Sequence, residues 1–310
     1  MKLSIVTTLY RSAAYIDEFH QRASKAARQI TDDYEIVMVN DGSPDDSLAR
    51  AVRLTTLDPR VVVVDLSRNF GHQKAMMTAV AQAQGDLIFL IDSDLEEEPE
   101  WLLPFAEQLQ REGCDVVYGV QARRKGGLFE RVTGQWFYRL FRLFTGLDLP
   151  ENIVTARLMI RDYARALCQF DEREVFLGGL WHITGFEQQP HTIVKHSLSE
   201  STYTLRHKVS LLVNAVTSFS SAPLIWIFNL GVLISIGAFA YCIYLVVNWL
   251  FLSAPAAGWT SVMASIWLLG GMVISFIGII GIYLSKVFSE TKRRPYVIIR
   301  RTYRGQQQDG

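Results

Sequence analysis

Short runs of β-branched residues alternate with amphipathic segments along the first 120 residues. The runs that predict strands cover residues 3–8, 35–40, 61–66, 87–92 and 116–120. The segments that predict helices cover residues 15–29, 46–56, 73–84 and 99–111. The strand at 61–66 opens with four consecutive valines, which is typical of a strand covered on both faces. The pattern predicts a doubly wound α/β domain over residues 1–205, whose ligands bind beyond the carboxyl ends of the strands.

Two long apolar runs dominate the chain after residue 222. In the first, over residues 223–252, the strongly polar side chains are Asn229 and Asn248, and the second, over residues 262–286, carries no charge before Lys286. At about 1.5 Å per residue, each run is long enough to cross a hydrocarbon core about 30 Å thick. We therefore expect two transmembrane helices. The alternative is a pair of buried core helices.

Charge around these runs predicts their orientation. The segment between them has no charged residue, whereas the tail at 287–310 is basic. By the positive-inside rule the tail is cytoplasmic, and two spans return the N-terminal domain to the same side. The N-terminus enters a strand and reaches polar residues too early for a signal peptide, which agrees with a cytoplasmic domain.

Two further segments, about 128–145 and 206–222, combine apolar and cationic residues at helical spacing. This composition predicts interfacial helices at an anionic leaflet, the second of them juxtamembrane. An amphipathic helix packed on the domain's own sheet is the alternative.

Composition removes several classes of function. The formal net charge is zero and the first half has no basic block, which argues against nucleic acid as a partner. The cysteines, Cys114, Cys168 and Cys242, form no Cys-x-x-Cys pair of the kind used for zinc or redox chemistry. The mean hydropathy of +0.14 is high for a soluble protein, and the two apolar runs account for it.

Polar residues follow three of the predicted strands. The second strand ends in Asn40-Asp41-Gly42-Ser43, the third runs into Ser67-Arg68-Asn69-Phe70-Gly71-His72, and the fourth ends in Asp92-Ser93-Asp94. No Gly-x-Gly-x-x-Gly follows the first strand and no Walker loop occurs, so dinucleotide and P-loop sites lose their main support. Paired carboxylates after a strand are ligands that Mg²⁺ or Mn²⁺ prefers, although the triplet alone also fits a solvated turn.

Taken in order, the motifs resemble those of family 2 glycosyltransferases of the GT-A fold. Within that family they resemble the polyprenyl-phosphate glycosyltransferases, which include dolichyl-phosphate mannose synthases and bacterial undecaprenyl-phosphate glucosyltransferases. Besides the three strand ends, the resemblance rests on Gly85-Asp86, Arg157-Leu158-Met159, Ser201-Thr202-Tyr203, Ser218-Phe219-Ser220, Pro223-Leu224 and Lys292-Arg293-Arg294-Pro295-Tyr296.

The resemblance implies a metal-dependent enzyme of the bacterial inner membrane, with its catalytic domain and both termini in the cytoplasm. It implies inverting transfer of a sugar from a nucleotide sugar, with UDP-glucose favoured, to undecaprenyl phosphate. Mg²⁺ or Mn²⁺ is the implied cofactor, and membrane lipid is an implied partner. Because two spans and interfacial helices are little for a monomeric membrane assembly, we also expect a homo-oligomer.

The resemblance also implies roles for individual residues. Nucleotide-sugar binding falls to Thr8, Tyr10, Asp41, Arg68, Asp92 and Ser93. The metal falls to Asp92, Asp94 and Glu96, with Asp94 the closer ligand, and the catalytic group is Asp94, Arg157 and Thr155. Acceptor phosphate binding falls to Arg123, Arg124, Lys195, His196 and Tyr203, although surface salt bridges are an equal alternative for the two arginines.

The chain departs from the family pattern at the general base. The family often has an Asp two residues before the catalytic arginine, and this sequence has Thr155. A phosphate monoester with a second pKa of about 6 is largely dianionic at neutral pH and can attack without a base. Two other functions stay open. They are an inactive membrane scaffold that binds nucleotide sugar, and a processive polysaccharide synthase, whose Gln-x-x-Arg-Trp motif the chain lacks.

Overall fold

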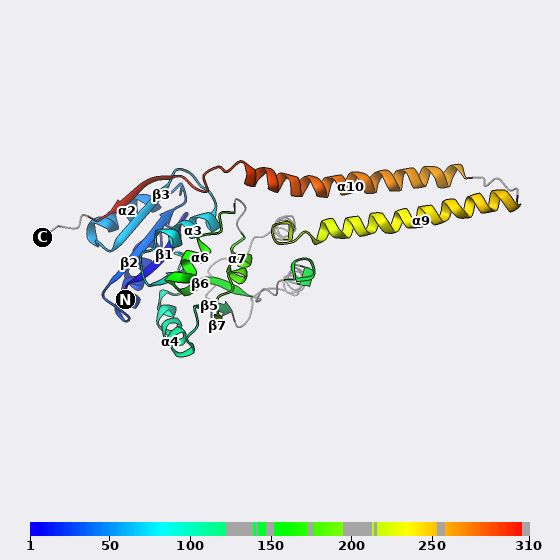
Figure 1. Cartoon of the computed structure of the whole chain (residues 1–310). Coiled ribbons are helices and arrows are strands. Elements are labelled where there is room, and N and C mark those ends of the chain that lie inside the picture. Colours follow the sequence, from blue (N-terminus) through cyan, green and yellow to red (C-terminus); the bar gives the residue numbers. More distant parts are fainter. Residues whose placement is uncertain are drawn as a thin grey trace. The chain divides into compact units, whose positions relative to one another are not determined.

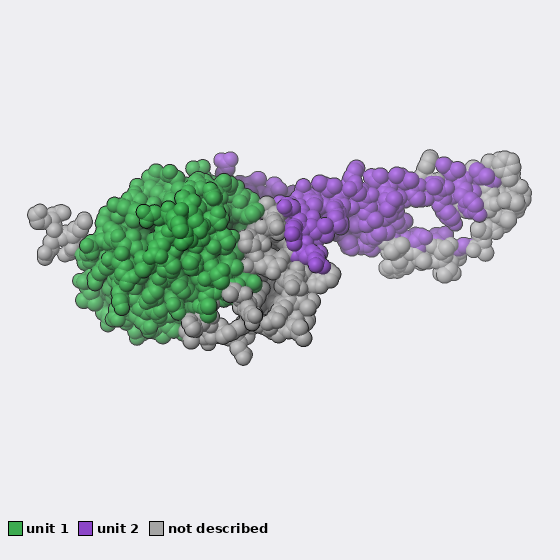
Figure 2. Space-filling model, turned by 90° about the horizontal axis from the view of Figure 1, so that it is seen from below, with its two compact units in different colours: residues 1–138, 147–203, 294–310 green, residues 139–146, 204–293 purple. Residues whose placement is uncertain are grey.

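The protein forms two compact units, which Figure 2 shows in separate colours. In a computed structural model we describe residues 1–121, 139–140, 142–146, 152–172, 176–194, 213, 216–252 and 258–305. Unit 1 comprises residues 1–138, 147–203 and 294–310, and unit 2 comprises residues 139–146 and 204–293.

Unit 1 is built on a mixed eight-stranded sheet in the order β7-β5-β6-β4-β1-β2-β3-β8. The strands are β1 (Leu3–Leu9), β2 (Tyr34–Asn40), β3 (Val61–Leu66), β4 (Leu87–Leu90), β5 (Val116–Gln121), β6 (Ile153–Ile160), β7 (Gln188–Ile193) and β8 (Ile299–Arg304). The four strands β4, β1, β2 and β3 are parallel, whereas β6 is antiparallel to β4 and β5, and β8 is antiparallel to β3. The carboxyl ends of the four parallel strands therefore meet at one edge.

Helices cover both faces of this sheet (Figure 1). They are α1 (Ile16–Arg28), α2 (Ser47–Leu57), α3 (His72–Gln82), the 3₁₀ turn η1 (Pro99–Trp101), α4 (Leu102–Glu112), α6 (Arg161–Leu167) and α7 (Leu177–Ile183). An apolar core that includes Ile5 and Phe19 lies under α1, α2 and α4, and within it the Phe105 ring meets the Phe89 ring edge-on at 6.0 Å. Helices α3 and α6 contact each other and pack on β1, β2, β4 and β6. The doubly wound arrangement of the parallel strands is confirmed.

The predicted elements of the first 120 residues are confirmed with small changes at their ends. The third strand has its predicted bounds, and the fourth ends at Leu90, so that Asp92 lies in the turn beyond it. The sequence analysis did not predict β6, β7 or β8. The polar strand β7 and the basic strand β8 lie at the two edges of the sheet, where polar residues are tolerated.

Unit 2 contains two long helices, α9 (Ala222–Leu252) and α10 (Trp259–Thr291), which lie side by side (Figure 1). Both expose apolar side chains, with Phe228 69% and Ile274 73% exposed. Among the described residues, one stretch, Leu269–Thr291, has the length and composition of a membrane span, at a mean hydropathy of 1.9. The apolar stretch Ala222–Ile234 of α9 is shorter. Helices thus lie where two spans were predicted, and the span predicted over residues 223–252 stays a prediction.

The predicted interfacial helices fall largely outside the described residues. Residues 139–140 and 142–145 of the first are helical, as are residues 213 and 216–219 of the second. Within unit 2, the hydroxyl of Tyr283 donates to the Ser220 carbonyl at 2.6 Å, and Lys286 Nζ donates to Ser218 Oγ at 2.7 Å. These bonds join the last turns of α10 to the segment that precedes α9.

The basic tail of the chain contributes the edge strand β8 to unit 1 (Figure 1, red). Its register on β3 contains an irregularity, because Asp65 pairs with Arg301 while Leu66 pairs with Ile299. One residue of β8, Arg300, is therefore left over, which is the arrangement of a β-bulge. The side chain of Tyr303 packs against the apolar core.

Candidate active site

The loops after β2 and β3 touch at the carboxyl edge of the sheet because Gly42 lets them approach. Gly42 has a φ of +61°, and a Cβ there would lie 2.5 Å from the amide nitrogen of Asn69 and 2.6 Å from the carbonyl carbon of Arg68. Only glycine accommodates both the left-handed backbone and this contact. The Asn-Asp-Gly-Ser motif therefore has a structural reason for its third residue.

Asp41 holds the loop that follows β3. Its carboxylate accepts hydrogen bonds from the amides of Phe70, at 2.7 Å, and Gly71, at 3.0 Å. The residue is 2% exposed. Burial raises the pKa of its carboxyl, and the two amide hydrogen bonds oppose that rise. Asp41 thus positions the loop, and its predicted contact with a nucleotide base stays a prediction.

His72, the first residue of α3, links Thr8 to Asp92. Its Nδ1 lies 3.1 Å from Thr8 Oγ1, and its Nε2 lies 3.4 Å from Asp92 Oδ1. Burial lowers the pKa of the imidazole, but the Asp92 hydrogen bond and the surrounding carboxylates outweigh it and raise the pKa. The contact fixes one carboxylate of the Asp-Ser-Asp motif relative to β1, and the predicted role of Thr8 in nucleotide binding stays a prediction.

The Asp-Ser-Asp motif forms a tight turn after β4. Ser93 is buried, and its hydroxyl donates to the Thr8 carbonyl at 2.8 Å. This hydrogen bond fastens the turn to β1. Asp94 Oδ1 accepts the Glu96 amide at 3.0 Å across Leu95, whose φ is +60°. The turn places two carboxylates at the edge of the sheet.

The donor set at this turn fits a hard divalent cation. Among the described residues, no group of three or more His, Cys, Asp or Glu side chains is arranged to hold a metal, so Asp92, Asp94 and Glu96 do not form a complete site by themselves. Mg²⁺ is commonly bound by one or two carboxylates, with water and substrate phosphate oxygens as the other ligands. Asp92 and Asp94 match that pattern, and the predicted ligand role of Glu96 stays a prediction.

Arg157 lies on β6, beside the end of β4. It is 1% exposed, and burial lowers its pKa to about 10. Its Nε donates to the Thr155 carbonyl at 3.4 Å, and Nη1 has no hydrogen-bond partner among the described residues. Nearby, the fully buried Glu97 accepts the Thr155 amide through Oε1 at 3.0 Å. The two predicted catalytic residues Thr155 and Arg157 are thus neighbours, fastened to the segment that follows Asp94.

A cavity of about 230 Å³ opens over Arg157. The Arg157 guanidinium lies 3.0 Å from the centre of the Trp181 ring, so the cation faces an aromatic surface. The cavity is lined by Tyr118, Ile153, Arg157, Gly178, Trp181, His182, Phe186 and Gln188. A buried guanidinium with a free donor in a cavity is suited to an anionic oxygen of a ligand.

Tyr10 and Arg68 stand at the rim of the same sheet edge. Tyr10 is 47% exposed, and the Arg11 guanidinium lies 5.7 Å from the centre of its ring. The exposed Arg68 lies 4.1 Å over the Phe70 ring. Both side chains are accessible, which a residue that binds a nucleotide requires. The predicted acceptor residues Arg123, Arg124, Lys195, His196 and Tyr203 lie outside the described residues.

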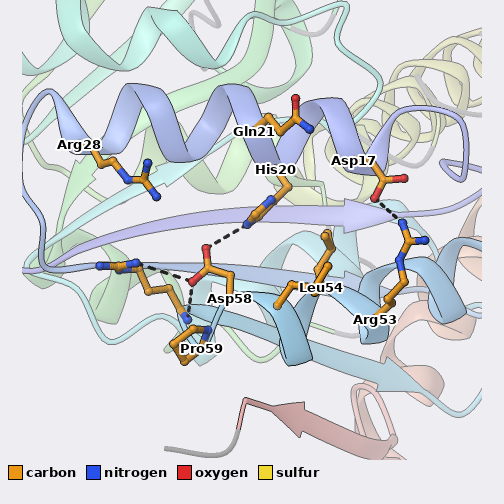
Figure 3. Close-up of a pocket in the computed structure, with 10 residues that line it drawn as sticks. Asp17, His20, Gln21, Arg28, Arg53, Leu54, Asp58 and Pro59 are labelled. Atoms are coloured by element: carbon orange, nitrogen blue, oxygen red, sulfur yellow. Dashed lines mark hydrogen bonds and ion pairs between the residues drawn. The ribbon is translucent and has the colours of Figure 1, made fainter.

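A second hollow, of about 570 Å³, lies between α1 and the α2–β3 connection (Figure 3). His20 Nε2 lies 3.0 Å from Asp58 Oδ2, and Arg53 pairs with Asp17 at 3.0 Å. None of the predicted site residues lines it. Its two acidic groups, Asp17 and Asp58, are engaged in ion pairs.

The sequence reasoning missed His72, Glu97 and Trp181 as members of the site. His72 is the last residue of the motif that follows the third strand. The argument that strand ends share one edge could therefore have predicted its place beside the acidic pair. Glu97 and Trp181 meet Arg157 only through the fold.

The comparison with known families agrees with this geometry. Residues 4–168, which include the sheet edge and both catalytic candidates on β6, match the model of glycosyl transferase family 2. The chain belongs to glycosyl transferase family 2.

Relatives of this family extend over nearly the whole chain. A Mycobacterium tuberculosis protein named only as a glycosyltransferase is 54% identical over 98% of this chain and 89% of its own length. The uncharacterized glycosyltransferase YkcC of Bacillus subtilis is 34% identical, over 98% and 94%. The SfII prophage-derived bactoprenol glucosyl transferase of Shigella flexneri is 29% identical, over 98% and 99%. The similarity therefore includes the helices of unit 2.

Proposed function

We propose that this family 2 glycosyltransferase transfers a sugar from a UDP-sugar, with UDP-glucose favoured, to undecaprenyl phosphate. The product is a polyprenyl-phosphate-linked monosaccharide. The observation that carries the proposal is the combination of an acidic pair at the donor edge of a family 2 fold with the apolar helices α9 and α10 in the same chain.

The acceptor is proposed from the relatives and from unit 2. Bactoprenol glucosyl transferases match this chain over nearly their whole length, helices included. The apolar side chains exposed along α9 and α10 suit a lipid environment, since soluble surfaces rarely expose such continuous apolar area. We therefore propose a lipid-phosphate acceptor at the cytoplasmic face of the bacterial inner membrane, with both helices as spans. A homo-oligomer is part of the same proposal.

The donor is proposed to bind at the carboxyl edge of β1, β2 and β4. Tyr10 and Arg68 would contact the nucleotide beside Thr8, and Asp41 would reach it only if its hydrogen bonds to the Phe70 and Gly71 amides open. Asp92 and Asp94 would hold Mg²⁺ or Mn²⁺. When bound, the cation neutralises charge on the leaving diphosphate. His72 keeps the Asp92 carboxylate in place through its 3.4 Å contact.

The reaction needs alignment more than proton transfer. The acceptor phosphate is already largely ionised at neutral pH, so Thr155 need not act as a base. Arg157 is proposed to stabilise negative charge from its buried position, where an ion–dipole or ion–ion interaction is stronger than in water. In-line attack on the anomeric carbon by a phosphate oxygen breaks the bond to the diphosphate and inverts the configuration.

Membranes that contain the protein, incubated with radiolabelled UDP-glucose, Mn²⁺ and undecaprenyl phosphate, test this proposal. We expect label in the chloroform-soluble fraction, lost in Asp94→Ala and kept in the matched control Asp32→Ala, an exposed acid at a turn before β2. Nucleotide binding without lipid label would instead indicate a scaffold, and a polymeric product would indicate a synthase. A lipid-linked sugar that retains the anomeric configuration of the donor would refute the in-line mechanism.

A further inference from the structure

The side chain of Arg300, on the tail strand β8, contacts the end of β3 and the loop that leads into the candidate donor site. We propose that Arg300 is a positioning residue for the nucleotide, which holds the loops after β2 and β3 in their binding geometry. The proposal rests on the proposed function of that sheet edge as the donor site. It assigns the tail a part in the site, in addition to any role of its charge at the membrane.

The bulge in β8 directs Arg300 to the site. Asp65 pairs with Arg301 and Leu66 pairs with Ile299, so Arg300 is the extra residue on β8. A bulge changes the direction of the side chain that it carries, and such irregularities recur beside active sites. Here it turns the guanidinium toward the end of β3 instead of leaving it in the regular alternation of the strand.

The first contact of Arg300 fixes the loop after β3. Its Nη2 donates to the Ser67 carbonyl at 2.6 Å, and the Ser67 amide donates to the Ile298 carbonyl at 2.9 Å. Both backbone polar groups of Ser67 are thus held by the tail. The next residue is Arg68, and the loop continues to His72, which touches Asp92.

The second contact fixes the loop after β2. Arg300 Nη1 lies 3.7 Å from Oδ2 of Asp65, whose side chain is 3% exposed. The other oxygen of Asp65 accepts Asn40 Nδ2 at 2.8 Å, and Asn40 Oδ1 accepts the Ser43 amide at 3.3 Å. One guanidinium therefore supports both of the loops that Gly42 brings together.

The Arg300 side chain is 61% exposed, whereas the Asp65 side chain is 3% exposed, so loss of Arg300 leaves a nearly inaccessible carboxylate with its Asn40 hydrogen bond but without this cation. Such a group is costly unless the structure relaxes to hydrate it. The segments free to relax are the two loops, because Asp65 itself lies within β3. Loops that must be ordered again when the nucleotide binds lower its affinity, since ordering is then part of the cost of binding.

Binding of UDP to the full chain in detergent, with Mn²⁺ present, is the first arm of the test. We expect Arg300→Gln to weaken binding about tenfold, which corresponds to about 1.4 kcal/mol. Arg301→Gln is the matched control, because Arg301 is the next residue of β8 and its guanidinium lies over Tyr303. Arg300→Lys keeps the charge but not the planar pair of donors, and we expect an intermediate affinity.

Hydrogen exchange of the ligand-free chain is the second arm. Peptides that contain the amides of Ser67, Phe70 and Gly71 should exchange faster in Arg300→Gln than in Arg301→Gln, whereas peptides of β1 should not change. Equal exchange in the two variants, or equal UDP affinity, overturns the proposal. If the wild-type chain fails to bind UDP, the donor site is wrong, and the exchange arm alone decides whether Arg300 positions the loops.

Discussion

Replacement of Gly42 by alanine should destabilise unit 1 more than its backbone conformation alone explains. The left-handed φ of +61° costs a residue with a Cβ about 1–2 kcal/mol. The new Cβ would also lie 2.5 Å from the Asn69 amide nitrogen, and a forced contact with backbone adds about 1–3 kcal/mol. We therefore expect a total loss of about 2–5 kcal/mol in the free energy of unfolding.

Gly113→Ala isolates the contribution of the contact. Gly113 ends α4 with a φ of +66°, and a Cβ there would meet no atom within 4 Å. This control has the same backbone cost. It also has the same effect on the unfolded chain, whose conformational entropy is lower with alanine than with glycine at the substituted position. The difference between the two variants should therefore be the contact alone, about 1–3 kcal/mol.

Urea titration of the detergent-solubilised full chain, read by pulse proteolysis, measures the stability of both variants. UDP affinity should fall in Gly42→Ala, because the Asn69 loop must move to make room, and should stay unchanged in Gly113→Ala. Equal stability losses in the two variants would refute the argument that Gly42 permits a close approach between loops.

Two further predictions concern charge. Arg157→Met should reduce turnover about 10²-fold or more, because a charge-stabilising donor is lost, and should lower the midpoint of thermal unfolding, because the fully buried Glu97 carboxylate loses its neighbouring cation. Adding Glu97→Gln should restore the midpoint but not turnover, and recovery of both would show a structural role instead. Burial would raise the pKa of Asp45, but hydrogen bonds from Ser43 and Ser47 lower it from 3.8 to about 2. Its stabilising effect is therefore present above pH 3.8 and lost as the pH falls toward about 2. In Asp45→Asn the free energy of unfolding, measured between these pH values, should depend less on pH than in the wild type. An unchanged pH dependence would contradict the assignment.

The first 120 residues reveal their fold because each element is locally consistent. The valine run of β3 and the amphipathic pattern of α1 both agree with the structure to within a residue or two. Strand β8 escapes the same reasoning, because Ile299–Arg304 is rich in arginine and becomes a strand only through its pairing with β3. Strand β7 is similarly polar and contains Pro190, which indicates a loop when it is read without its neighbour.

The candidate site divides in the same way. Asp92, Asp94 and Asp41 follow strands, so parallel pairing alone predicts that they share an edge. Side-chain direction is not encoded at that level. Ser93 donates to β1, both carboxylate oxygens of Asp41 accept backbone amides, and Arg157 faces the Trp181 ring. Tertiary packing decides each of these orientations.

The position of β8 at the end of the chain has a consequence for synthesis. The ribosome makes α9 and α10 before it makes Ile299–Arg304, so the edge of β3 waits without its partner until the apolar helices have left the exit tunnel. The unpaired edge of a valine-rich strand such as β3 is prone to aggregate. Truncation ahead of α9 would leave that edge open permanently, whereas a fragment in which residues 292–305 are joined after residue 203 would close it.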